Sequence, residues 1–192
     1  ITVYVPDHPR LLALLTGACA AGGANIVGAK IFTTTDGMAL YTLLIQREFD
    51  EARDEERRID RILKLMRQAF AGKIQLRKAV AEASRPKGRI KAFTVEPQVI
   101  VSNDTSNRFT VVEVAGLDRL GLLFKLTDSL FRLNLNIASA QITTFGERAV
   151  DVFYVTDLIG QKITSKTRLQ SIEQSLLDVL ETGRKQEIAK AG

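Results

Sequence analysis

Two short loops combine an acidic side chain with the start of a predicted helix, which suits recognition of a small charged ligand. The loops read Asp7-His8-Pro9-Arg10-Leu11-Leu12 and Asp118-Arg119-Leu120-Gly121-Leu122-Leu123. An Asn-Ile pair follows 18 residues after each aspartate, as Asn25-Ile26 and Asn136-Ile137. The first-turn N–H groups of a helix lack intrahelical partners, so they and the helix dipole attract an anion. With Asp and Asn oxygens for an ammonium group, each set suits an α-amino acid.

The two loops belong to an internal repeat with an offset of 111 residues. Ten of the 29 positions from Asp7 to Thr35 carry the same residue as the position 111 later. So much identity predicts two copies of one module. The copies differ at the loop, because Arg10 stands where the second copy has Gly121 and places a long side chain over the amides. A one-residue gap then aligns Tyr41 with Asp151, so the first site is the more altered one.

Alternating and helical patterns predict the elements that position the second loop. Residues 109–115 alternate as a strand does, and leucines recur every three or four positions along residues 120–133. Asp118 therefore falls where a helix N-cap is expected, and Gly121 leaves the first-turn amides open to a backbone or a small ligand. Asn136 would lie beside the Asp118 loop if the strand that begins at Ile137 returned along the first.

The remaining pattern predicts two modules, residues 1–103 and 104–192, joined at a polar turn. In the first we expect strands at 1–5, 26–34 and 38–46, and helices from Pro9 to Gly22, up to Phe70 and at 75–83. A basic connector at about 72–92 then precedes a last strand within 93–101. In the second we expect strands at 109–115, 137–145 and 149–156 and a helix at 165–181, with its fourth strand missing or very short. The β-α-β-β-α-β order predicts an α+β protein made of two ferredoxin-like domains in tandem.

Composition places the chain among globular proteins. It has 192 residues, 45% hydrophobic and 26% charged, which fits two small domains. No apolar run reaches the roughly 20 residues that a bilayer requires, so no membrane association is expected. A single cysteine, Cys19, excludes a disulfide framework and favours an intracellular, cytoplasmic protein. Because Ile1 already lies inside a strand, we expect a piece of a longer protein.

The net charge of +5 is concentrated in residues 72–93, which hold seven Lys and Arg against one Glu. Such a run with almost no aromatic residues is more typical of a solvated linker than of a nucleic-acid surface. The strand Ala149-Val150-Asp151-Val152-Phe153 also lacks the glycine and aromatic pattern of RNA-recognition modules. Catalysis has little support, because the only histidine, His8, has no nucleophile beside it in sequence and no metal-ligand or phosphate-binding motif is present.

Two simpler interpretations compete with a ligand site. Asp7 and Asp118 could only cap helices while Asn25 and Asn136 only turn the chain. Alternatively, the whole chain could be a ligand-free interaction or dimerisation module, whose copies pair with each other or with a partner chain through sheet edges and helices. The recurrence of acid, helix start and Asn-Ile in both copies favours the ligand interpretation.

The motif Asp118 to Leu123, the pair Asn136-Ile137 and the strand 149–155 resemble the ACT domain, an amino-acid-sensing module of regulated metabolic enzymes. The tandem arrangement, with residues 94–123, resembles the C-terminal region of the bifunctional enzymes that add UMP to and remove UMP from the nitrogen-signalling protein P-II. The resemblance implies that L-glutamine binds near the two loops and controls catalytic domains elsewhere in a parent chain. Those nucleotidyltransferase and hydrolase domains would use Mg²⁺, whereas no cofactor is expected in this fragment. Homo-oligomers through ACT–ACT packing are a further expectation.

Overall fold

The computed structural model of the chain describes residues 1–48, 50–84 and 95–191. Within them the strands are β1 Thr2–Pro6, β2 Ile26–Thr33, β3 Met38–Ile45, β4 Gln98–Ser102, β5 Thr110–Leu117, β6 Leu135–Phe145 and β7 Arg148–Asp157. The helices are α1 Leu11–Ala21, α2 Ala52–Phe70, α3 Leu76–Ala83, α4 Leu122–Arg132 and α5 Lys166–Ala191. The chain is thus α+β, and its strand and helix order repeats the ferredoxin-like pattern expected from the sequence.

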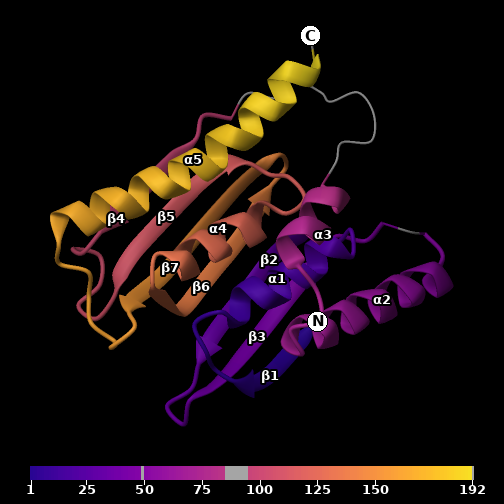
Figure 1. Cartoon of the computed structure of the whole chain (residues 1–192), viewed down its shortest axis with the longest axis horizontal. Coiled ribbons are helices and arrows are strands. Elements are labelled where there is room, and N and C mark those ends of the chain that lie inside the picture. Colours follow the sequence, from indigo (N-terminus) through magenta and orange to yellow (C-terminus); the bar gives the residue numbers. More distant parts are fainter. Residues whose placement is uncertain (49, 85–94, 192) are drawn as a thin grey trace.

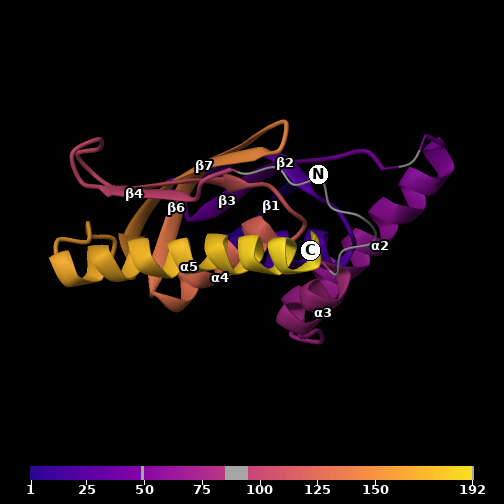
Figure 2. The same cartoon turned by 90° about the horizontal axis from the view of Figure 1, so that it is seen from above.

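One antiparallel sheet, in the order β1-β3-β2-β6-β7-β5-β4, runs through both modules (Figure 1). The two halves meet where β2 pairs with β6, with Ala29 opposite Ile142 and Ile31 opposite Ala140. The helices lie on one face of the sheet, and α2 projects beyond its end (Figure 2). Side-by-side pairing of the two copies therefore makes a single continuous sheet under one layer of helices.

The strand register establishes which residues of the two modules are equivalent. Tyr41 lies opposite Val3 and Ile31, and Asp151 lies opposite Val114 and Ile142. Val3 and Val114 are 111 residues apart, as are Ile31 and Ile142, whereas Tyr41 and Asp151 are separated by one residue less. The gap that aligned these two residues in sequence is therefore real, and it lies in the turn between the second and third strands.

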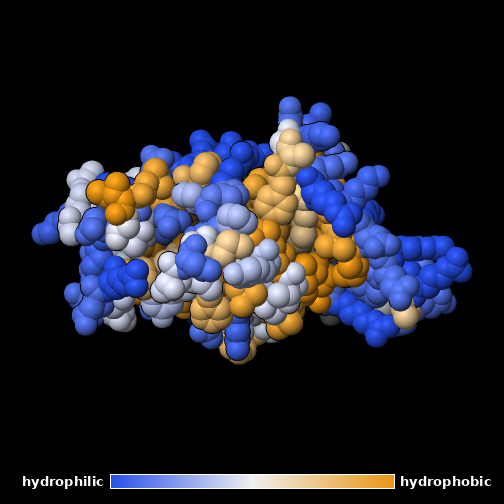
Figure 3. All heavy atoms as spheres, turned by 90° about the horizontal axis from the view of Figure 1, so that it is seen from below, coloured by the Kyte–Doolittle hydropathy of each residue, from blue (hydrophilic) through white to orange (hydrophobic). Residues whose placement is uncertain are grey.

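The core lies between the sheet and the helices. α1 is apolar on all sides and is buried from Leu11 to Ala20, because α2, α3 and α4 all pack on it. Where α1 meets α4, the hydroxyls of the equivalent residues Thr16 and Thr127 are 3.1 Å apart and buried. The charged helix α2 forms the hydrophilic projection in Figure 3, beside a band of apolar side chains. None of the described helices combines the length and apolar character needed to cross a membrane.

The strand expected to complete the first module completes the second. β4 pairs with β5, at the opposite end of the sheet from β1. Seven residues connect β4 to β5, a short hairpin-like link, and Val99 is buried in the core that α5 covers. The second module therefore has its fourth strand after all, supplied from before its first strand. The part of the predicted basic connector from residue 85 to 92 lies outside the described residues.

Two helix ends also differ from the sequence-based expectation. α1 begins at Leu11 and not at Pro9, because residues 9 and 10 form a turn in which Leu11 N–H donates to His8 O at 2.9 Å. α5 continues to Ala191, ten residues beyond the predicted end at 181. α3, by contrast, forms at Leu76–Ala83, within the short helix that was predicted inside the basic connector.

Candidate functional site

The second loop connects β5 to α4 and is held by backbone contacts. Asp118 N–H donates to Glu147 O at 2.8 Å, and Gly121 is the N-cap of α4 with φ +83°. No side chain caps this helix, so the expected N-cap role of Asp118 is wrong. Since three residues separate Asp118 from Leu122, its carboxylate is not placed as an N-cap and remains available for other groups.

The carboxylate of Asp118 accepts hydrogen bonds from both modules. Asn25 Nδ2 donates to Asp118 Oδ2 at 2.8 Å, and Thr144 Oγ1 donates to the same oxygen at 3.4 Å. The sequence had suggested Asn136 as the neighbour of Asp118. Instead β7 separates β5 from β6, and Asn136 pairs with Thr156 at the far end of that strand. Antiparallel pairing of β2 with β6 brings the start of β2, and with it Asn25, to the Asp118 end.

Asp151 lies on the same helix-facing side of the sheet and was missing from the residues predicted for the site. Its side chain is 2% exposed, and its strand neighbour Ile142 is two positions from Thr144. Burial raises its pKa to about 7, and the negative charge of Asp118 contributes to the rise, while a hydrogen bond with the Thr143 backbone opposes it. A signal was available in the sequence, because Asp151 shares the alternation of the core residues Ala149, Phe153 and Val155.

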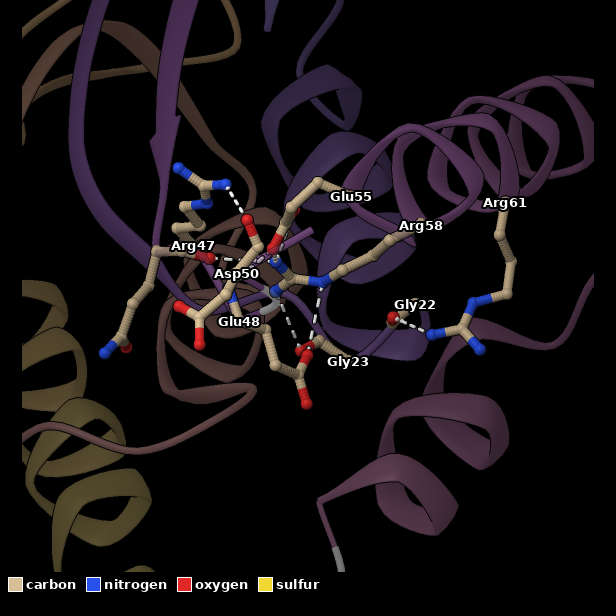
Figure 4. Close-up of polar contacts among 9 residues, drawn as sticks. Gly22, Gly23, Arg47, Glu48, Asp50, Glu55, Arg58 and Arg61 are labelled. Atoms are coloured by element: carbon tan, nitrogen blue, oxygen red, sulfur yellow. Dashed lines mark hydrogen bonds and ion pairs between the residues drawn. The ribbon is translucent and has the colours of Figure 1, made fainter. Parts of the chain in front are cut away.

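A polar network fixes the turn that presents Asn25 (Figure 4). Arg58, 4% exposed, donates to Gly23 O at 3.3 Å and to Gln46 O at 2.9 Å, and it pairs with Glu48 and Glu55. Arg61 donates to Gly22 O at 2.6 Å. These guanidinium groups satisfy carbonyls at the C-terminal end of α1, where cations are favoured. They therefore anchor the turn that leads into Asn25.

The first loop has a different arrangement. Asp7 Oδ2 accepts a hydrogen bond from Thr33 at 3.0 Å, the counterpart of the Thr144 contact. Tyr41 takes the place of Asp151, and its pKa is raised by burial and by the charge and hydrogen bond of Asp7. Arg10 lies over the ring of Phe131, 5.7 Å from its centroid. The two sites thus differ at Arg10 and Tyr41, the positions where the repeat differs in sequence. Arg10 was expected over the amides of the first turn, whereas its guanidinium lies against Phe131 of the other module.

α3 covers the glycine of the second loop. A Cβ placed on Gly121 would lie 2.8 Å from both Val80 Cγ1 and Ser84 Oγ. The Ser84 hydroxyl is buried and has no hydrogen-bond partner within the described part of the chain. The open space expected beside Gly121 is therefore occupied by α3, a helix of the basic connector. In the first turn of α4, the N–H groups of Leu123 and Phe124 donate to no backbone acceptor among the described residues.

The other predicted site residues mostly support the loops from within the protein. Arg119 Nη2 donates to Val179 O on α5 at 2.8 Å, and exposed His8 contributes its carbonyl to the turn before α1. The remaining apolar positions lie in or beside the core; those buried are Leu11, Ile26, Leu122 and Ile137. No group of three His, Cys, Asp or Glu side chains in the described ranges is arranged to hold a metal ion.

The α+β fold with its repeated modules agrees with comparison to known proteins. Residues 105–183, most of the second module, match the model of the ACR family N-terminal ACT domain, so this module is similar to ACT domains. The chain is also similar to the bifunctional uridylyltransferase/uridylyl-removing enzyme of Nitrobacter hamburgensis, with 53% identity over 183 residues. The match covers 95% of this chain but 20% of that enzyme, so the chain spans about a fifth of its relative's length. Both resemblances expected from the sequence are thereby confirmed.

Proposed function

We propose that this chain is the amino-acid-sensing region of a longer uridylyltransferase/uridylyl-removing enzyme and binds L-glutamine between its two modules. In this proposal, bound glutamine controls the addition of UMP to P-II and its removal by catalytic domains outside this chain. The observation that carries the proposal is the contact of Asn25 with Asp118 across the module interface, beside the buried Asp151. The kind of enzyme rests on the similarity to the Nitrobacter hamburgensis enzyme. The choice of glutamine rests on the resemblance of this sequence to the C-terminal region of such enzymes.

The proposed binding mode uses both ends of the amino acid. The ligand's ammonium group lies against Asp118 and Asp151, where one positive charge relieves the repulsion between two carboxylates. Its carboxylate receives the N–H groups of Leu123 and Phe124 at the positive end of α4. Both contacts are stronger for a zwitterion than for an amine or an acid alone, which gives selectivity for α-amino acids.

In this proposal, movement of α3 couples ligand binding to the rest of the enzyme. Val80 and Ser84 lie over Gly121, so a ligand that reaches the amides of α4 must move α3 outward or reorient Ser84. Because α3 lies between the two modules in sequence, its movement would alter the connector. Coupling of about 1–3 kcal/mol between ligand and α3 position is enough for regulation.

The first site is proposed to be structural. Arg10 is engaged with Phe131, and Tyr41 removes the second carboxylate that an ammonium group would require. One ligand per chain is therefore expected, bound at the Asp118 loop.

A thermal-shift panel of all twenty amino acids, followed by calorimetry, tests this function. At a hundred times its Kd a ligand stabilises the protein by about 2.7 kcal/mol, which raises the melting temperature by about 5–10 °C for a chain of this size. Glutamine should give the largest shift, with a stoichiometry of one. No shift and no heat with millimolar glutamine, in this chain and in the parent enzyme, would refute the proposal.

The second candidate is an interaction module without a ligand. It is favoured by the same contact of Val80 and Ser84 with Gly121, which fills the space beside the loop with the protein's own atoms. Light scattering and the thermal-shift measurement together separate the two candidates. A pure interaction module keeps both its mass and its melting temperature when amino acids are added.

A further inference from the structure

The outer edge of β1 carries backbone groups that no described strand binds. Ile1 and Leu43 exchange backbone hydrogen bonds of 2.9 and 2.8 Å, and Asp7 N–H donates to Gly37 O at 2.9 Å. Backbone groups alternate sides along an antiparallel pair, so those of Ile1 and Asp7 face β3 while those of Thr2 and Tyr4 face away. Since β1 is the last strand at its end of the sheet, this edge is unpaired within the described residues.

The same edge is occupied in the second module. Thr2 and Tyr4 correspond to Glu113 and Ala115, which lie opposite Ile100 and Gln98 of β4. β4 leads into β5 along the chain, so the second module receives its fourth strand from the segment that precedes it.

β1 is less buried than its counterpart β5, as expected if β1 lacks the neighbouring strand that β5 has. Val112 and Val114 of β5 are 0% and 3% exposed. Their counterparts Ile1 and Val3 are only partly buried, although they face the same core side of the sheet. The exposed apolar area beside β1 is therefore what β4 covers in the second module, and covering it is favourable.

We propose that the edge of β1 binds a fourth strand, contributed by the polypeptide that leads into β1 in the parent protein. The strand runs antiparallel to β1, as β4 does to β5, and hydrogen-bonds the backbone of Thr2 and Tyr4. Its inward-facing side chains are apolar and cover Ile1 and Val3. The repeat selects this occupant over another chain, because each module would then receive its fourth strand from its own preceding segment.

Proline substitution and amide exchange in the parent enzyme test this pairing. Tyr4→Pro removes one outward N–H, and Ala115→Pro removes its paired counterpart in the second module. If β1 is paired, Tyr4→Pro speeds amide exchange in β1 and its partner strand, as Ala115→Pro does in β5 and β4. In the unmodified protein, the Tyr4 amide then exchanges on the order of 100-fold more slowly than an unbonded amide. The inference is overturned if the Tyr4 amide exchanges as fast as an unbonded one and Tyr4→Pro leaves β1 unchanged while Ala115→Pro disrupts β5.

Protein concentration distinguishes the proposed strand from a second copy of the chain. Protection of Thr2 and Tyr4 that is independent of concentration, in a protein of constant mass by light scattering, supports pairing within one chain. Protection that appears only as dimers form assigns the edge to another copy and overturns the inference. Neither readout depends on glutamine, so the result is separate from that of the proposed function.

Discussion

Asn25 Nδ2 donates a 2.8 Å hydrogen bond to Asp118 Oδ2, joining residues 93 positions apart in two copies of one module. The contact exists because β2 and β6 pair antiparallel, which places the start of each strand beside the other module's strand end. A repeat that arose within one chain has thus produced a polar site that neither copy contains alone.

Asn25→Ala should weaken both folding and ligand binding. It leaves the half-buried Asp118 carboxylate without its strongest donor, at an expected cost of about 1–3 kcal/mol in unfolding free energy. Asn136→Ala is the matched control, since the equivalent side chain makes no hydrogen bond in the described structure, and it should cost within about 0.5 kcal/mol. Urea unfolding measures both variants, and equal effects would argue against a special role for Asn25.

Asp151 should make stability fall as pH rises. Its pKa is about 7 in the folded chain against 3.8 for an ordinary Asp, so between about pH 4 and 7 the folded state holds a proton that the unfolded chain has released. This contribution is complete below pH 4, declines towards pH 7 and is lost above it. Asp151→Asn should therefore be more stable than the wild type at pH 8, by on the order of a few kcal/mol, and similar at pH 4.

The same group links glutamine binding to proton release. An ammonium group beside Asp151 lowers its pKa, so affinity should increase from pH 6 to pH 8, and calorimetry in buffers of different ionisation enthalpy should detect a released proton. Asp151→Asn should abolish that release. Release that persists in this variant would assign the proton to another group.

Gly121→Ala should be more costly than an ordinary glycine substitution. Gly121 and Gly160 have φ of +83° and +82°, so alanine at either position costs about 1–2 kcal/mol in backbone strain. Gly121 adds the 2.8 Å approaches of Val80 and Ser84, whereas nothing lies within 4 Å of a Cβ on Gly160. Overpacking should raise the total for Gly121→Ala to about 2–4 kcal/mol by urea unfolding. Similar costs for both variants would show that α3 does not press on this loop.

Arg58→Met should loosen the turn that carries Asn25. Removing a buried guanidinium that serves Gly23, Gln46 and two glutamates should cost about 3–5 kcal/mol and reduce the glutamine response with it. Arg57→Met is the control, because Arg57 is 65% exposed and its removal should change stability by less than about 0.5 kcal/mol. A ligand response that survives Arg58→Met at full strength would separate the turn from the site.

Thr16 and Thr127 should couple the two modules. Each hydroxyl lies within hydrogen-bond distance of a carbonyl of its own helix, at 2.8 Å for Thr16 and 2.9 Å for Thr127, and the two oxygens are 3.1 Å apart. One hydroxyl can therefore donate to the other across the interface while the second donates to its own helix. A double-mutant cycle with Thr16→Val and Thr127→Val should give a coupling energy of about 0.5–1.5 kcal/mol. Additive effects would show that packing alone joins α1 to α4.

The sequence by itself determined the repeat, the two loops and nearly every strand and helix, because these follow from residue identity and local periodicity. It also indicated where the copies differ, at Arg10 and Tyr41. Tertiary structure decided which asparagine meets Asp118, that β4 pairs with β5, that Asp151 faces the site and that α3 covers Gly121. The reason is that antiparallel pairing exchanges the ends of strands between modules, and alternation along a strand does not specify which strand will lie beside it.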